Sequence, residues 1–304
     1  MSWLIFSIVP PALWALSNHI DKYMLGKFFK NRDGGPFMLF TAFFGILVAL
    51  YVLIFRFGSI STDPKSALIM LVSGAASFLS GYLYLVALKK DSPSVVVPLF
   101  QLIPIFRYFL GMFFLNEFLS GPQIFACLLV IAGSMILTLE SVGNKFKLKM
   151  HVILPMLLCT LVTAVNGLAF KYVAVESNYW NTQFWDFLGL FIAGVVVFNL
   201  NPSWRKVFSE IIGHKKSFVL GITFFNEIIN VAAGLIFTYA MLLMPLAIVS
   251  VVSNGLQPFF VLLFGVILTL LTPKLAHVTL SKRNLVQKII AIGVIFLGTY
   301  LLNR

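Results

Sequence analysis

The stretch that decides the fold is Phe218–Leu271, which reads FVLGITFFNEIINVAAGLIFTYAMLLMPLAIVSVVSNGLQPFFVLLFGVILTLL. It contains one charged residue, Glu227, and two prolines, Pro245 and Pro258. A helix needs about 20 apolar residues to cross the hydrocarbon core of a bilayer. The stretch is long enough for two such helices, and we expect them over residues 218–243 and 245–271.

The rest of the chain has the same character. Hydrophobic residues make up 60% and charged residues 11% of the 304 residues, whereas soluble domains have about 45–50% and about 25%. This composition excludes a soluble globular protein, a disordered chain and a nucleic-acid-binding domain. Ten segments are long and apolar enough to span a membrane: 3–24, 36–57, 66–88, 92–116, 120–141, 151–173, 179–200, 218–243, 245–271 and 285–303. We therefore expect an all-α integral membrane protein with ten transmembrane helices.

Two segments need a separate interpretation. The first span has no basic residue before it and contains Pro10 and Pro11, so we expect a retained helix rather than a cleaved signal peptide. The piece between spans seven and eight contains Trp204–Ile212, which is expected to form a short amphipathic helix on the membrane surface.

The basic residues predict the orientation. Of the 22 lysines and arginines, 17 lie in odd-numbered loops, four lie in even-numbered loops or at the C-terminus, and Arg107 lies within a span. Cytoplasmic loops carry an excess of lysine and arginine. The odd-numbered loops are thus expected in the cytoplasm and both termini outside, in a prokaryotic cytoplasmic membrane.

A weak internal repeat relates the two halves of the chain. Ser17–Tyr23 closes the first expected span, and Asn166–Tyr172 closes the sixth. Five further correspondences keep the same order along the chain: Pro104 with Pro258, Gly111 with Gly265, Gly81 with Gly234, Ala87 with Ala240, and Pro93 with Pro245. We expect two five-helix repeats, 1–143 and 144–304.

Five spans per repeat have a physical consequence. An odd number inverts the second copy relative to the first, with a pseudo-two-fold axis in the membrane plane. Rocking of one half against the other then gives alternating access to a substrate site near the midplane.

This arrangement resembles the drug/metabolite transporter superfamily, EamA type. The resemblance is carried by Gly81–Glu117 and Pro245–Leu302. The carrying residues are Pro93, Pro98, Pro104, Gly111 and Glu117 in the first stretch, and Pro245, Pro258, Gly265, Gly293 and Gly298 in the second. Asn116-Glu117 is similar to the Gly-Glu-like pair that ends the fourth span in this family, whereas the place near Leu271 has no glutamate. The resemblance implies the fold and a transport function, but no particular substrate.

Glu227 is the clearest candidate for a functional residue. A central charge in a membrane costs roughly 2.5–3.5 kcal/mol on insertion scales, so such residues mark functional sites. Glu227 shares one helical face with Asn226 and Asn230. We interpret this face as a cavity wall on which Glu227 carries a proton or binds a cation. The alternative is a fixed hydrogen bond or ion pair between helices.

Arg107 lies in the middle of the fourth span. Its guanidinium stays protonated and needs an acceptor or water. We expect Arg107 either to pair with Glu227 or to compete with it for a substrate. The alternative is an arginine that extends to the interface or binds only carbonyl groups at a span end.

The first span carries Asn18, His19 and Asp21 in its inner part, with Trp14 one turn earlier. We interpret the cluster as an inner gate in which His19 is a candidate proton relay. The alternative is that Lys22 extends to the interface and that Asp21 simply pairs with it. The aromatic residues that could contact a cationic ligand are Trp14, Tyr82, Tyr84, Trp185 and Tyr239.

The ninth span carries a polar stripe of Ser250, Ser253, Asn254 and Gln257 at helical spacing, and Gln101 lies in the fourth span. Both sets adjoin a proline, which frees a carbonyl in the preceding turn. The freed groups either face a cavity or are satisfied by polar contacts between helices.

The expected substrate-binding residues are Glu227, Asn226, Asn230, Arg107, Asn254, Gln257, Gln101, Asn18, Trp14 and Tyr84. Glu227, His19 and Asp21 are the expected proton-coupling or gate residues. Together they favour a secondary transporter, with export as the favoured direction, of a small polar or amphiphilic metabolite. Such a transporter would be proton-coupled or an exchanger.

Two other functions stay open, namely a flippase for a lipid-linked substrate and a non-transporting membrane scaffold. The sequence has no P-loop, no HExxH, no GxSxG and no paired cysteines or histidines. We therefore expect no enzyme activity, cofactor or metal. The expected partners are a small-molecule substrate and the bilayer, and the expected state is a monomer, because duplicated halves close a cavity alone.

Overall fold

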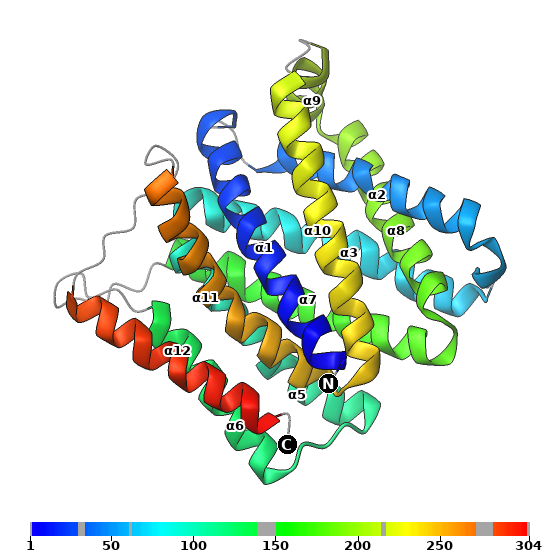
Figure 1. Ribbon diagram of the computed structural model, residues 1–304. Coiled ribbons are helices and arrows are strands. Elements are labelled where there is room, and N and C mark those ends of the chain that lie inside the picture. Colours follow the sequence, from blue (N-terminus) through cyan, green and yellow to red (C-terminus); the bar gives the residue numbers. More distant parts are fainter. Residues whose placement is uncertain are drawn as a thin grey trace.

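The computed structural model describes residues 2–29, 34–60, 63–138, 150–213, 217–271 and 282–302. Within these ranges the chain forms helices and no strands (Figure 1). The α-helices are α1 Ser2–Lys27, α2 Gly35–Phe55, α3 Pro64–Lys90, α4 Pro93–Val96, α5 Leu102–Leu115, α6 Gly121–Thr138, α7 Met150–Glu176, α8 Tyr179–Leu200, α9 Pro202–Gly213, α10 Ser217–Leu243, α11 Leu246–Leu271 and α12 Lys282–Leu302. Short 3-10 helices lie at Phe57–Ser59 (η1) and Val97–Gln101 (η2).

Membrane-spanning length is reached by fewer of these helices than the sequence predicts. In the described part of the chain, 8 helices are long and apolar enough to cross a membrane. The apolar parts of α6 and α12, Gly121–Ile136 and Val286–Leu302, are shorter. The prediction of an all-α fold is confirmed. Of the ten expected spans, eight correspond to helices that are long and apolar enough to cross a membrane.

The expected fourth span, 92–116, is not one helix. It is divided into α4, η2 and α5. Pro93 and Pro98 lie in the first turns of α4 and η2, where a missing backbone N–H is tolerated. The last turn of α5 ends at Asn116, whose φ of 53° is left-handed. In contrast, α11 continues as one helix through Pro258.

Packing joins helices that are far apart in the sequence. Helix α3 packs along α7 and α8, α1 packs along α10 and α11, and α2 packs along α8. Helices α6 and α12 lie side by side at one edge (Figure 1). Each of these contacts pairs a helix from residues 1–143 with one from 144–304.

The contact between α3 and α8 is very close, and that between α2 and α10 is not. A Cβ atom at Gly74 would overlap the backbone of Asp186 and Leu190, and one at Gly189 would overlap the backbone of Leu71. Glycine therefore lets α3 and α8 touch through their backbones. Helices α2 and α10 make far fewer contacts, so one pair is closed and the other is held apart.

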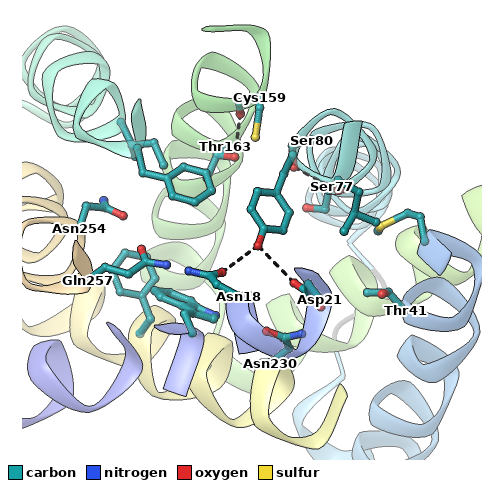
Figure 2. Close-up of a pocket in the computed structure, with 18 of the residues that line it drawn as sticks. Asn18, Asp21, Thr41, Ser77, Ser80, Cys159, Thr163, Asn230, Asn254 and Gln257 are labelled. Carbon is teal, nitrogen blue, oxygen red and sulfur yellow. Dashed lines mark hydrogen bonds between the residues drawn. The ribbon is translucent and has the colours of Figure 1, made fainter. Parts of the chain in front are cut away.

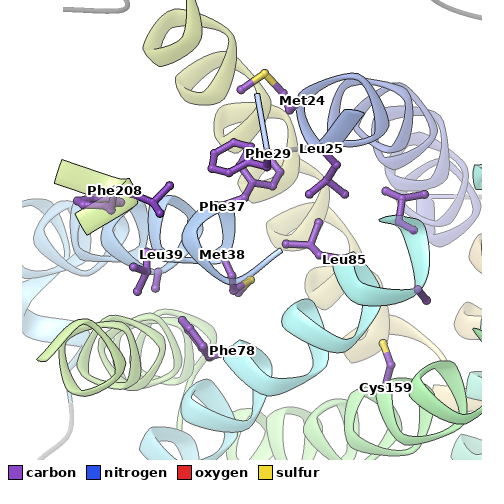
Figure 3. Close-up of a cluster of buried hydrophobic side chains, with 14 of the residues drawn as sticks. Met24, Leu25, Phe29, Phe37, Met38, Leu39, Phe78, Leu85, Cys159 and Phe208 are labelled. Atoms are coloured by element: carbon purple, nitrogen blue, oxygen red, sulfur yellow. The ribbon is translucent and has the colours of Figure 1, made fainter. Parts of the chain in front are cut away.

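Helix α9 confirms the expected short helix at Trp204–Ile212. Its buried side chains are Val207, Phe208 and Ile211. Phe208 belongs to a buried apolar cluster that joins α1, α2, α3, α7 and α9 (Figure 3). The labelled members of this cluster are Met24, Leu25, Phe29, Phe37, Met38, Leu39, Phe78, Leu85, Cys159 and Phe208.

Two lysines make equivalent contacts in the two halves. Lys22 Nζ donates to the carbonyl oxygens of Leu88 at 2.7 Å and Asp91 at 2.6 Å. Lys171 Nζ donates to the carbonyl oxygen of Met244 at 2.7 Å. Each lysine thus satisfies carbonyl groups at the C-terminal end of the third helix of its half, where a cation is favourable.

Candidate functional site

A cavity of about 320 Å³ lies between the two halves of the protein (Figure 2). Helices α1, α2, α3, α5, α7, α8, α10 and α11 all contribute to its wall. The polar lining residues are Asn18, Asp21, Thr41, Ser77, Ser80, Tyr84, Arg107, Thr163, Asn230, Asn254 and Gln257. Polar groups from both halves therefore converge on one cavity inside a bundle of apolar helices.

A hydrogen-bonded network forms one wall of the cavity. The Tyr84 hydroxyl donates to Asn18 Oδ1 at 2.9 Å and to Asp21 Oδ2 at 3.3 Å (Figure 2). Asn226 Nδ2 donates to Asp21 Oδ1 at 2.7 Å. The buried Asp21 carboxyl group is therefore held by side chains from α3 and α10. Asn18 Nδ2 has no hydrogen-bond partner among the described residues.

Arg107 is buried at the cavity, with 3% of its surface exposed. It donates to Ser250 Oγ at 2.8 Å and to the carbonyl oxygen of Thr163 at 3.1 Å. Its guanidinium lies 5.2 Å from the ring centre of Phe237. Among the described residues no carboxylate pairs with Arg107, and its Nε has no partner. The guanidinium is therefore held by two hydrogen bonds and an aromatic ring at the cavity, while its Nε is buried without a partner.

The expected pair of Arg107 and Glu227 is not formed. Glu227 Oε1 instead accepts a hydrogen bond from the Thr41 hydroxyl at 2.7 Å. The two side chains lie at different heights along α10. Arg107 lies beside Phe237, which is ten residues and about 15 Å farther along α10 than Glu227. The alternative in which Asp21 simply pairs with Lys22 is not realised either, since each side chain has the other partners described above.

Most of the predicted binding residues line the cavity. They are Trp14, Asn18, Tyr84, Arg107, Asn230, Asn254 and Gln257, and the predicted gate residue Asp21 lines the cavity as well. Asn226 lies behind Asp21, and Gln101 donates to the carbonyl oxygen of Asn254. His19 Nε2 lies 3.0 Å from the carbonyl oxygen of Val261 and joins α1 to α11. Glu227 lines a second, apolar cleft between α2 and α10.

The sequence analysis missed four hydroxyl residues of the cavity: Thr41, Ser77, Ser80 and Thr163. A signal for two of them is present. Ser77, Ser80, Gly81 and Tyr84 follow helical spacing on α3, so they form one small polar stripe. Thr163 lies between Thr160 and Asn166 at a spacing of three residues, which is a weaker pattern, and Thr41 is an isolated hydroxyl in an apolar helix.

A second polar cluster joins the halves at the far end of α5. Glu117 forms an ion pair with Lys171 and accepts a hydrogen bond from the backbone N–H of Leu246 at 2.7 Å. Glu117 follows α5, Lys171 lies on α7, and Leu246 begins α11. The cluster ties residues of the first half to two helices of the second.

Comparisons with known proteins identify the family. A model of the EamA-like transporter family matches residues 1–139. An uncharacterized protein of Methanocaldococcus jannaschii is 31% identical over 97 residues, which are 32% of this chain and 71% of the relative. The chain belongs to the EamA-like transporter family. This agrees with the resemblance to the drug/metabolite transporter superfamily.

Membership of the EamA-like family makes the protein a multi-pass membrane protein of transporter type. A crystal structure of another protein covers 99% of this chain and 95% of that chain, with 17% identity and a TM-score of 0.62. That similarity shows a common fold. The EamA-like helices of this chain therefore surround the polar cavity in an architecture that a solved structure also has.

Proposed function

We propose that the protein is a secondary transporter that carries a small polar or amphiphilic metabolite by alternating access between two inverted halves. The observation that carries this proposal is the cavity itself. It lies between the halves, and its wall combines amides, hydroxyls, Asp21 and Arg107. A fixed structural contact would satisfy these groups, whereas a binding site leaves some of them available.

The two unpaired groups indicate the chemistry of the substrate. Arg107 Nε and Asn18 Nδ2 are both donors without a partner in the described part of the chain. A buried donor without an acceptor costs about 1–3 kcal/mol, and a ligand that supplies acceptors removes this cost. Because Arg107 also brings a positive charge, the substrate that fits has a carboxylate or phosphate group.

Three features support the inverted repeat, with repeats over 1–143 and 144–304. Lys22 and Lys171 are corresponding residues in the sequence, and each binds a carbonyl between the third and fourth spans of its half. The acceptors Asp91 and Met244 each lie four residues after the aligned Ala87 and Ala240. In addition, α1 begins and α12 ends at the same end of the bundle (Figure 1), as an even number of spans requires.

The difference between two helix pairs supports alternating access. Under the repeat, α3 with α8 corresponds to α10 with α2. The first pair is in backbone contact and the second is separated. The separation lies in the first halves of α2 and α10, which the charge count places toward the cytoplasm. An exporter loads from that side, so this asymmetry favours export across a prokaryotic cytoplasmic membrane.

The membrane-embedded acids are the candidates for coupling. Asp21 lines the cavity, and Glu227 lies behind Thr41, which lines it too. We propose that Glu227 carries the coupling proton. Flux by the wild-type protein should then depend on pH, and flux by Glu227→Gln should not. Identical pH profiles of the two proteins would remove Glu227 from this role.

The experiment that tests the transport function uses proteoliposomes loaded with a pool of anionic, zwitterionic and cationic metabolites. Mass spectrometry measures which of them leave in a protein-dependent way. Ser80→Phe places a ring in the cavity, while Leu79→Phe changes the neighbouring side chain, which is 48% exposed on the bundle surface. We expect loss of carboxylate- or phosphate-bearing metabolites from wild type and Leu79→Phe vesicles but not from Ser80→Phe. No protein-dependent loss of any class would contradict transport.

A flippase for a lipid-linked substrate is a second candidate, because an apolar cleft approaches the cavity. Thr41 lines the cavity, Glu227 lines the cleft, and a hydrogen bond joins these two side chains. A head group could lie in the cavity and its tail in the cleft. Transfer of a fluorescent lipid-linked sugar across the vesicle membrane, without loss of soluble metabolites, would favour this function.

A further inference from the structure

A cleft of about 470 Å³ separates α2 from α10. Its apolar lining residues are Phe40, Phe43, Phe44, Leu47, Leu220 and Phe224, and the others are Gly221, Thr223 and Glu227. Leu47 and Phe224 are 46% and 52% exposed. In a membrane their surface contacts lipid, so the cleft opens sideways into the bilayer and not into water. Its volume is in the range of small-molecule sites.

The depth of the cleft matches one leaflet. Helix α10 has 27 residues and is about 40 Å long, so it exceeds the ~30 Å hydrocarbon core by about 5 Å at each end. The cleft begins at Leu220 and ends at Glu227, which lie about 5 Å and about 15 Å from the start of α10. It therefore runs from the interface into the leaflet on the side where α10 begins.

The wall of the cleft contains a polar side chain, Thr223. Thr223 is 3% exposed, lines the cleft, and its hydroxyl has no hydrogen-bond partner among the described residues. It lies about 9 Å from the start of α10, close to the boundary between head groups and hydrocarbon. The hydroxyl is covered in this arrangement, and rotation of the Thr223 side chain would turn an unpaired donor into the cleft at the depth of the ester carbonyl of a phospholipid.

Helix α9 supplies positive charge near the same cleft. Phe208 of α9 packs against Phe40 at 4.4 Å and Phe43 at 5.2 Å between ring centres, and both phenylalanines line the cleft. Arg205 lies three residues before Phe208 and so borders the same face of α9, and Lys206 follows it in the chain. Both basic residues are exposed. Basic residues at a membrane surface attract anionic lipids.

We propose that the cleft between α2 and α10 is a lipid-binding site that holds one acyl chain of an anionic phospholipid. The chain lies along Phe40, Phe44 and Phe224, the ester carbonyl accepts from Thr223, and the head group lies near Arg205 and Lys206. The site exists only while α2 and α10 are apart. A lipid that binds one of two states shifts the equilibrium toward that state, so the bound lipid stabilises the arrangement described above. This site does not depend on which metabolite the central cavity binds.

The test uses the full chain in nanodiscs that contain phosphatidylglycerol with a photoactivatable diazirine on one acyl chain. Mass spectrometry then measures which peptides carry the label. Gly221→Phe fills the cleft, because a Cβ at Gly221 meets no atom within 4 Å. Gly293→Phe is the matched control, since Gly293 is also exposed with no atom within 4 Å and lies on α12, away from the cleft.

We expect wild type and Gly293→Phe to carry label concentrated in residues 40–47 and 220–227, and Gly221→Phe to lose this enrichment. Label spread evenly over all exposed helices, or enrichment that persists in Gly221→Phe, would overturn the site.

A phosphatidylcholine probe tests the head group. We expect the phosphatidylcholine probe to label the cleft less than the phosphatidylglycerol probe does. In the double variant Arg205→Gln/Lys206→Gln the two probes should label the cleft equally. Equal labelling of the wild-type protein by both probes would overturn the assignment of an anionic lipid.

Discussion

The guanidinium of Arg107 lies 5.2 Å from the ring centre of Phe237, and the Nε of Arg107 has no partner among the described residues. The aromatic ring stabilises the buried cation through its negative face. Ser250 and the carbonyl of Thr163 hold two other nitrogens. The side chain is thus fixed in position at the cavity, with one buried donor left unpaired.

Arg107→Lys tests the role of this side chain in binding. Lysine keeps the charge but lacks the planar group that donates in several directions. Hydrogen bonds to charged groups contribute about 1.5–3 kcal/mol, so we expect the apparent affinity for the carboxylate or phosphate substrate to fall about 10- to 100-fold. Arg56→Lys is the control, because Arg56 lies 5.5 Å from the Trp180 ring outside the cavity. Equal transport constants for both variants would contradict the assignment.

Gly167→Ala tests the same site from α7. A Cβ at Gly167 would lie too close to the guanidinium of Arg107, so the arginine must move. Overpacking costs about 1–3 kcal/mol, and we expect a lower melting temperature and loss of transport. Gly26→Ala should be neutral or slightly stabilising, since no atom lies within 4 Å there. In Gly167→Ala/Arg107→Gln the stability loss should be less than additive, and an additive loss would show that the two residues do not interact.

The ion pair of Glu117 and Lys171 is expected to contribute to stability. Glu117→Gln removes the charge that binds Lys171 and weakens the bond to the Leu246 N–H. Residues in one polar network show coupling of about 0.5–3 kcal/mol. Thermal or denaturant unfolding of Glu117→Gln, Lys171→Met and the double variant measures this coupling. Strictly additive effects would mean that the cluster does not act as a unit.

Asp63 is expected to give α3 a pH-dependent N-terminus. The carboxylate accepts from the Ser66 N–H at 2.9 Å, and this bond lowers the pKa of the exposed Asp63 below its ordinary value. A lowered pKa in the folded state means that the stabilisation is complete above the unfolded pKa of about 3.9. It is lost as the pH falls through the folded value.

Hydrogen exchange of the first turn of α3 measures this effect, with Asp63→Asn as the reference because asparagine caps without titrating. Protection in the wild-type protein, relative to Asp63→Asn, should fall below about pH 4. A ratio of protection that stays constant down to pH 2 would contradict the assignment.

Several polar residues that stand out in the sequence line the cavity of the structure, although Glu227 does not. Arg107, Asp21 and the amides of Asn18, Asn254 and Gln257 stand out because such groups are costly in a membrane and are retained where they are used. All five line the cavity. Hydroxyl groups do not stand out, because a helical threonine can bond to its own helix. Thr163, for example, donates to the Cys159 carbonyl at 2.8 Å.

The partners within the site could not be predicted. Arg107 bonds to Ser250 and Thr163 rather than Glu227 because the rotation and crossing of α5, α7 and α11 determine which groups meet. These angles arise from side-chain packing between distant helices, which hydropathy and spacing do not specify.

The division of the expected fourth span into α4, η2 and α5 also depends in part on packing. Pro93 and Pro98 are visible in the sequence, but the 3-10 helix at Val97–Gln101 is a property of its packing.

Glu227 connects the asymmetry of the helix pairs to alternating access. Aligning Gly81 with Gly234 places Gly74 opposite Glu227, since each lies seven residues earlier. Gly74 lets α3 touch α8, whereas the Glu227 side chain extends toward Thr41 and stands between α10 and α2. We expect Glu227→Gly to let α2 and α10 approach as closely as α3 and α8 do. Glu227→Gln, with nearly the same volume, should keep them apart.

Pulsed electron–electron resonance of spin-labelled protein in bilayers tests this central claim most directly. One pair of labels, at Leu47→Cys and Phe225→Cys, measures the gap between α2 and α10, and another, at Val72→Cys and Ile192→Cys, measures that between α3 and α8. All four positions are exposed on the bundle. We predict that Glu227→Gly shortens the first distance and lengthens the second, while Glu227→Gln leaves both as in wild type. Two distances that stay unchanged in Glu227→Gly, or that change in the same direction, would contradict alternating access between the two halves.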